Sequence, residues 1–164
     1  KDATGGPTKF DLAREELGRT LASLDEGVAF VVFLYRYPSE YPPRAKLTRA
    51  LGSLKPWSKA RAKKAVSWLG RQEAKGWGAF SDALALLLAE DVDTIYFLSD
   101  GRTSRGRYDR GFRLIDELKR GNRFRRVVIH TVLTGHERAD REFLQDLANA
   151  TGGRFSDAGA GSGR

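Results

Sequence analysis

The fold class of this chain is decided by the stretch TIYFLSDG, residues 94–101. Residues 94–98 are β-favouring or apolar without polar alternation, which is typical of a strand buried on both faces of a parallel sheet. The polar turn after it places Asp100 just beyond the carboxyl end of the strand, where open α/β sheets bind their ligands. Asp100 is therefore a candidate metal ligand, and an Asp that merely caps a turn is the alternative.

Hydrophobic periodicity predicts helices and strands in alternation on either side of this stretch. Further strands are expected at 28–35 and 127–133, with a short edge strand near 47–54 and a last one starting at 154–155. Apolar residues at helical spacing predict helices near 10–24, 59–69, 80–88, 112–121 and 143–151. This order predicts an α/β fold with a mostly parallel sheet covered by helices on both faces.

Composition fits one globular domain and suggests acidic partners. The chain has 164 residues, 40% of them apolar and 30% charged, which suffices for a hydrophobic core. It has no cysteine, which excludes disulfides, thiolate metal sites and a Cys nucleophile, and no apolar run approaches membrane-spanning length. The formal net charge of +8 favours nucleic acid, an anionic membrane or an acidic protein surface as partner.

Two stretches rich in Lys and Arg make a nucleic-acid-binding domain the alternative hypothesis. They lie at residues 59–64 and 119–126, and no DNA- or RNA-binding motif accompanies them. Solvated helix faces and helix ends explain the same charges. Binding of nucleic acid therefore stays the second hypothesis for the function of this chain.

Catalytic motifs are not visible in the sequence. Histidine occurs only at His130 and His136, and there is no G-x-S-x-G elbow, phosphate loop or dinucleotide fingerprint. A hydrolase that uses Asp100 with either histidine has the least support, because no nucleophile, base and orienting group can be named together. We expect a binding module and not an enzyme.

The segment from Val92 to Gly101 resembles the strand and metal loop of von Willebrand factor type A (VWA) domains. The resemblance continues, in the same order and spacing, through residues 9–17, 76–84, 126–132 and 143–155. It implies a Rossmann-like sheet and, in intact members, a metal-ion-dependent adhesion site. The expected domain is residues 1–155, and residues 156–164 are expected to form a disordered tail rich in Gly, Ala and Ser.

The resemblance implies an incomplete metal site in this chain. The family site combines an Asp-x-Ser-x-Ser loop after the first strand, a Thr in a second loop and an Asp in a third. Only Asp100 matches, with Ser99 beside it; the Thr position corresponds to Gly78, and the first strand with its loop is absent. Truncation and a natural variant are the two explanations. We expect Mg²⁺ to bind weakly or not at all.

The resemblance also implies a partner-binding surface near Asp100. Its expected residues are Trp77, Phe80, Thr103, Ser104, Arg105 and Tyr108. Arg102, Arg105 and Arg107 could receive an acidic protein partner by charge alone, or could simply keep the loop soluble.

Overall fold

The computed structural model describes residues 7–36, 46–74, 78, 80–101, 111–135 and 138–159. Helices and strands alternate along these residues, as the sequence predicts. The elements in chain order are α1 (Lys9–Ala22), β1 (Ala29–Arg36), β2 (Lys46–Pro56), α2 (Lys59–Gly70), α3 (Phe80–Leu87), β3 (Thr94–Ser99), α4 (Gly111–Asn122), β4 (Val128–Leu133), α5 (Arg138–Ala150) and β5 (Phe155–Asp157).

The strands form two separate hydrogen-bonded sheets. Strands β3, β4 and β5 lie in that order and all pair in parallel, whereas β1 and β2 form an antiparallel pair. The expected α/β class with a mostly parallel sheet is confirmed. The division into two sheets is a feature that the sequence did not reveal.

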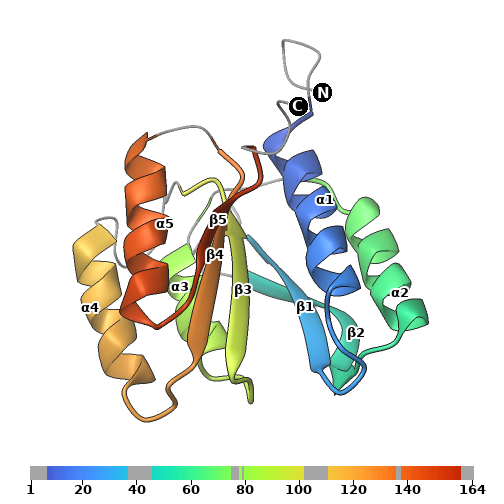
Figure 1. Ribbon diagram of the computed structural model, residues 1–164, viewed down its shortest axis with the longest axis horizontal. Helices are drawn as coiled ribbons and strands as arrows, with labels where there is room; N and C mark the ends of the chain where they lie inside the picture. The colour runs from blue at the N-terminus through green and yellow to red at the C-terminus, as the bar shows by residue number, and fades with distance from the viewer. Residues whose placement is uncertain are drawn as a thin grey trace.

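Helices cover the two sheets from opposite sides (Figure 1). Helices α3, α4 and α5 pack with β3 and β4 around a first core cluster, which includes Phe80, Phe97 and Leu147. Helices α1 and α2 pack on β1 and β2 around a second cluster, which includes Leu17 and Phe30. Leu98 of β3 packs against this second cluster, so β3 lies between the two halves of the core.

Strand β3 departs from the expectation of burial on both faces. Its buried residues are Ile95, Phe97 and Ser99, whereas Tyr96 is 47% exposed and stacks on His130 of β4 at 4.7 Å between ring centroids. The prediction of burial on both faces is wrong for Tyr96. The first core cluster takes up only the face that carries Ile95 and Phe97, and α1 contacts β3 only sparsely.

The extent of β2 and the end of the ordered chain also differ from the boundaries that the sequence predicts. Strand β2 is eleven residues long, well beyond the short strand expected at 47–54, because it pairs with β1 up to Pro56. Residues 156 and 157 belong to β5, and Ala158 is buried, so the expectation of a disordered tail starting at residue 156 is wrong. Residues 160–164 lie outside the described part of the chain.

Candidate functional site at the carboxyl edge of the sheet

The turn after β3 fixes the position of Asp100. Gly101 adopts a φ of +83°, and a Cβ on this residue would lie 2.3 Å from the Cβ of Asp140 in α5. Glycine is required here both for the backbone conformation and for the close approach of α5. The sequence prediction that Asp100 lies at the carboxyl end of β3 is therefore confirmed.

The hydroxyl of Ser99, the second candidate ligand, already takes part in two hydrogen bonds. Its Oγ accepts one from the backbone N–H of Gly101 at 3.1 Å and one from the Tyr35 hydroxyl at 3.3 Å. Burial raises the pKa of Tyr35 to about 12, and the nearby Asp100 carboxylate adds to this rise, so the phenol stays protonated and can donate. Ser99 thus links β3 to β1.

A lysine from the first helix meets the candidate metal ligand. The Nζ atom of Lys9 lies 3.0 Å from Oδ2 of Asp100, and the two side chains are 48% and 33% exposed. The residues are 91 positions apart in sequence. Sequence reasoning missed this pair because nothing in the local pattern around Lys9 indicates its partner.

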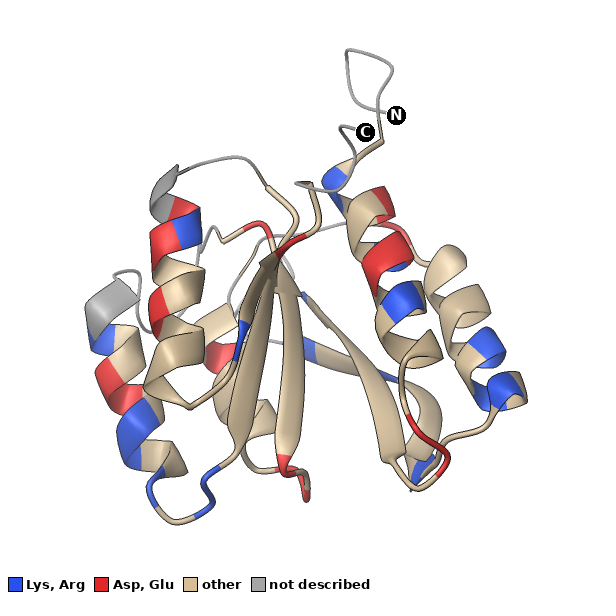
Figure 2. Cartoon of the chain, viewed as in Figure 1, with Lys and Arg blue, Asp and Glu red and all other residues tan. Residues whose placement is uncertain are grey.

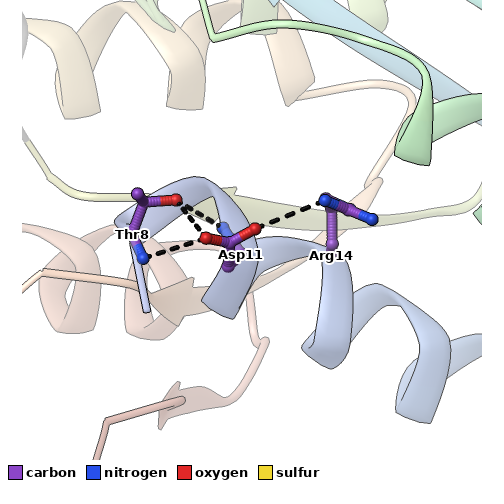
Figure 3. A network of polar contacts seen from close by, with 3 residues as sticks. All are labelled: Thr8, Asp11 and Arg14. Atoms are coloured by element: carbon purple, nitrogen blue, oxygen red, sulfur yellow. Dashed lines mark hydrogen bonds and ion pairs between the residues drawn. The ribbon is translucent and has the colours of Figure 1, made fainter. Parts of the chain in front are cut away.

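A capping box sets where α1 begins and so where Lys9 lies (Figure 3). The Thr8 hydroxyl accepts a hydrogen bond from the Asp11 backbone N–H at 3.1 Å, and the Asp11 carboxylate accepts one from the Thr8 N–H at 3.0 Å. The Thr8 hydroxyl also donates a hydrogen bond to Oδ2 of Asp11 at 2.7 Å. This bond and the one from the Thr8 N–H, with the charge of Arg14, hold the pKa of Asp11 below its usual value. Lys9 is the first helical residue after this cap.

The described residues do not fit a divalent metal ion. Mg²⁺ prefers several oxygen ligands in near-octahedral geometry, but among the described residues no group of three or more His, Asp or Glu side chains could hold a metal. Gly78 offers no side-chain oxygen, and an ammonium group already contacts Asp100.

Of the residues expected at the partner surface, Phe80 is the one that the structure describes. Phe80 is 1% exposed and packs between Phe97 and Phe143, with ring centroids at 5.9 and 5.1 Å, so the expectation that it is presented to a partner is wrong. Its position at the first turn of α3 directs it into the core. The other expected residues, Trp77, Thr103, Ser104, Arg105 and Tyr108, lie outside the described residues, as do Arg102, Arg107 and His136.

The two basic stretches do not join into one surface. The first lies on α2 and the second at the end of α4 and in the turn before β4, on opposite sides of the molecule (Figures 1 and 2). His130 also lies away from a catalytic arrangement, because its Nδ1 accepts a hydrogen bond from the Arg154 backbone N–H at 3.0 Å. The described part of the chain thus gives no support to the nucleic-acid or hydrolase reading.

The arrangement defines the class of protein as an open, Rossmann-like α/β domain with its candidate site at the carboxyl edge of a parallel sheet. Among solved structures, the chain shares its fold with a von Willebrand factor type A protein from Catenulispora acidiphila, at a TM-score of 0.61 and 15% sequence identity. The match covers 90% of this chain but only 34% of that one. No family model matches the sequence.

This likeness confirms the fold expected from the sequence resemblance. At 15% identity it shows the fold alone, and the ligands of the larger protein do not transfer with it. Within the described part of the chain, every helix is too short or too polar to cross a lipid bilayer.

Proposed function

We propose that this chain is a VWA-like protein-interaction module, not an enzyme, whose adhesion site is degenerate and works without a tightly bound metal ion. The fold supports the first part, because the carboxyl edge of such a sheet is where ligands bind. The chemistry of the described residues at that edge supports the second part.

The observation that carries the proposal is the ion pair between Lys9 and Asp100. An ammonium at 3.0 Å from Oδ2 supplies positive charge beside the carboxylate that a cation would otherwise contact. To coordinate Asp100 through this oxygen, a divalent ion would first have to displace Lys9. We therefore expect Mg²⁺ to bind weakly or not at all.

The expected partner is a protein with an acidic surface. The whole chain carries a net charge of +8, and the sequence that follows Asp100 contains Arg102, Arg105 and Arg107, which lie outside the described residues. Charge complementarity of this kind speeds encounter and selects among partners. The contact then depends on arginine side chains and not on a shared metal ion.

Calorimetric titration with MgCl₂ and MnCl₂ tests the metal part of the proposal. We expect no tight uptake by the wild-type chain or by Asp100→Ala, and also none by Lys9→Gln, because removing the ammonium leaves too few oxygen ligands. Tight uptake by the wild-type chain that disappears in Asp100→Ala would contradict the proposal.

Capture of acidic protein partners tests the interaction part. Arg105→Glu combined with Arg107→Glu should abolish capture at moderate salt, whereas Lys63→Glu combined with Lys64→Glu on α2 makes the same change of charge and should leave capture intact. Equal capture by both variants would reject the arginine contact. A gel shift of DNA or RNA that weakens steeply with salt would instead favour the nucleic-acid alternative.

A further inference from the structure

The most exposed large apolar residue in the described part of the chain is Phe124, which lies in the turn between α4 and β4. It is 87% exposed, whereas the next most exposed aromatic residue, Tyr96, is at 47%. Single exposed apolar residues are ordinary on protein surfaces, so exposure by itself assigns no function. Phe124 differs from such residues in the charge around it and in the order of its turn.

Basic residues surround Phe124. Five of the eight residues 119–126 are Lys or Arg, and no Asp or Glu occurs from residue 118 to residue 136. In Figure 2 these basic residues lie at the lower end of α4 and in the turn below it. The guanidinium carbon of Arg123 lies 5.6 Å from the centroid of the Phe124 ring, a distance typical of a cation–π contact. Residues 119–126, here called the basic turn, thus present an apolar ring together with concentrated positive charge.

Nearby carboxylates offset only part of this charge. Arg125 lies 3.8 Å from the carboxylate of Asp91, and Arg120 lies 3.2 Å from that of Glu117. Both ion pairs are exposed, so solvent screens them. Among the described residues, three basic side chains of the turn take part in no ion pair, namely Lys119, Arg123 and Arg126. An anionic surface can approach these three without displacing a partner.

Hydrogen bonds hold the backbone of the basic turn in place. The N–H of Arg126 donates to the carbonyl oxygen of Asn122 at 2.8 Å, and the Asn122 side chain bonds both backbone groups of Val127 at 2.7 Å. Arg126 adopts a φ of 53°, a left-handed conformation that is unfavourable for a residue other than glycine. Because the turn is already ordered, binding through Phe124 requires little further ordering of the backbone.

The basic turn lies at the opposite edge of the sheet from Asp100. It precedes β4, which runs parallel to β3, so it lies at the amino edge, whereas Asp100 follows β3 at the carboxyl edge. In Figure 1 the turn between α4 and β4 forms the lower left corner of the molecule. A partner bound at one edge therefore leaves the other edge accessible.

An anionic lipid surface fits this combination of features. An apolar ring suits the boundary between headgroups and acyl chains, and Lys and Arg beside it can reach the charged headgroups. Each Lys or Arg near such a surface strengthens binding by about fivefold. Single-stranded nucleic acid is instead bound in grooves where several aromatic rings stack on successive bases, and the basic turn has one aromatic ring.

We propose that the basic turn docks this domain on an anionic membrane surface. The Phe124 ring then lies among the lipid headgroups, and the five Lys and Arg side chains contact lipid phosphates and carboxylates. In this orientation the carboxyl edge of the sheet points away from the bilayer and stays open to a protein partner. The inference goes beyond the proposed interaction function, because it concerns another edge of the sheet and a lipid partner.

Co-sedimentation with lipid vesicles tests the proposal. We expect the chain to bind vesicles of phosphatidylcholine and phosphatidylserine mixed at about 7:3, and not vesicles of phosphatidylcholine alone. Phe124→Ala should weaken binding by roughly fivefold, because the ring no longer enters the headgroup layer. Lys119→Gln combined with Arg123→Gln should weaken it by roughly twentyfold, because two charges are lost.

A matched variant controls for net charge. Lys63→Gln combined with Lys64→Gln on α2 removes the same charge from the other side of the molecule. It should leave vesicle binding nearly unchanged at physiological salt, because charges far from the lipid surface are screened. Circular dichroism of all variants checks that they remain folded.

A fluorescent label reports whether the turn enters the lipid. The chain has no cysteine, so Phe124→Cys provides a single site for an environment-sensitive nitrobenzoxadiazole label. We expect its emission to move to shorter wavelength on the phosphatidylserine vesicles. The same label on Lys63→Cys should show no change.

Three results would each overturn this inference. They are no binding to phosphatidylserine vesicles, equal weakening by the double variants of the basic turn and of α2, and unchanged emission from the label at residue 124. A gel shift of single-stranded DNA that depends on Phe124, without vesicle binding, would assign the turn to nucleic acid instead. Phe124→Ala should leave capture of an acidic protein through Arg105 and Arg107 intact, so the two proposals fail separately.

Discussion

At the scale of single residues, the contacts of His130 in β4 depend on whether its imidazole is protonated, and therefore on pH. Its ring stacks on Tyr96, and its Nδ1 accepts a hydrogen bond from the Arg154 N–H, which requires the nitrogen to be unprotonated. Burial, together with the charge of Arg154, lowers the pKa of His130 below its usual value of 6.5. The folded chain therefore favours the neutral imidazole.

This shift predicts a pH-dependent loss of stability. As pH falls below 6.5, the unfolded chain takes up the proton first, so the free energy of unfolding decreases as pH falls through the lower folded pKa. Urea unfolding at pH 7.5 and pH 5.0 should show this loss in the wild-type chain, and His130→Asn should reduce it. The same pH dependence in both proteins would contradict the assignment to His130.

The sequence predicted the position of only some of the residues at the candidate site. Asp100 follows an apolar strand and precedes a glycine, a local pattern that indicates its position. Phe80 has no such signal, because a phenylalanine at the start of a helix can face the core or the solvent. The structure places it in the core, so one expected partner residue is lost from the surface.

At the scale of secondary-structure elements, Asn122 joins the end of α4 to the start of β4. Its Nδ2 donates to the carbonyl oxygen of Val127 and its Oδ1 accepts from the Val127 N–H, both at 2.7 Å. Asn122 is 8% exposed and Val127 is fully buried. One side chain therefore satisfies both backbone groups of a buried residue.

Asn122→Ala should destabilise the chain by about 3 kcal/mol, because it leaves a buried donor and a buried acceptor without their partner. The matched change Asn149→Ala, at an exposed position of α5, should alter the free energy of unfolding by less than about 0.5 kcal/mol. Chemical unfolding monitored by circular dichroism measures both. Equal effects of the two variants would show that the hydrogen bonds of Asn122 contribute little.

The sequence predicted most elements because their signals are local. Periodic apolar residues and glycine stops indicate α4 and α5, and a run of β-favouring residues indicates β4. Strand β2 was harder to predict, since its extent depends on pairing with β1. Leu51 and Gly52, at φ of 60° and 74°, lie in β2 beside the irregular register between Phe30 and Val32, and no local pattern predicts that bend.

At the scale of the whole molecule, the two halves of the core differ in how completely they are enclosed. Strand β4 has hydrogen-bonded neighbours on both sides, and its helices close the first core cluster around it. The second cluster borders a groove between β1 and β3, and among the described strands β1 has no partner on that side. Local opening should therefore cost less in β1 than in β4.

Native-state hydrogen exchange followed by mass spectrometry should reveal this difference. We expect the amides of β4 to exchange slowest, and alternate amides of β1, those facing the groove, to exchange much faster. The helix amides of α5 serve as an internal reference, since α5 packs directly on β4. Protection of β1 equal to that of β4 would contradict an open edge in solution.

The sequence by itself determined the alternation of helices and strands, the α/β class and the position of Asp100, because each depends on residues close together in the chain. Only the tertiary structure decided the division into two sheets, the burial of Phe80 and the groove beside β3. It also brought Lys9 to Asp100 across 91 positions of sequence. These features depend on the packing of distant segments, which local periodicity does not encode.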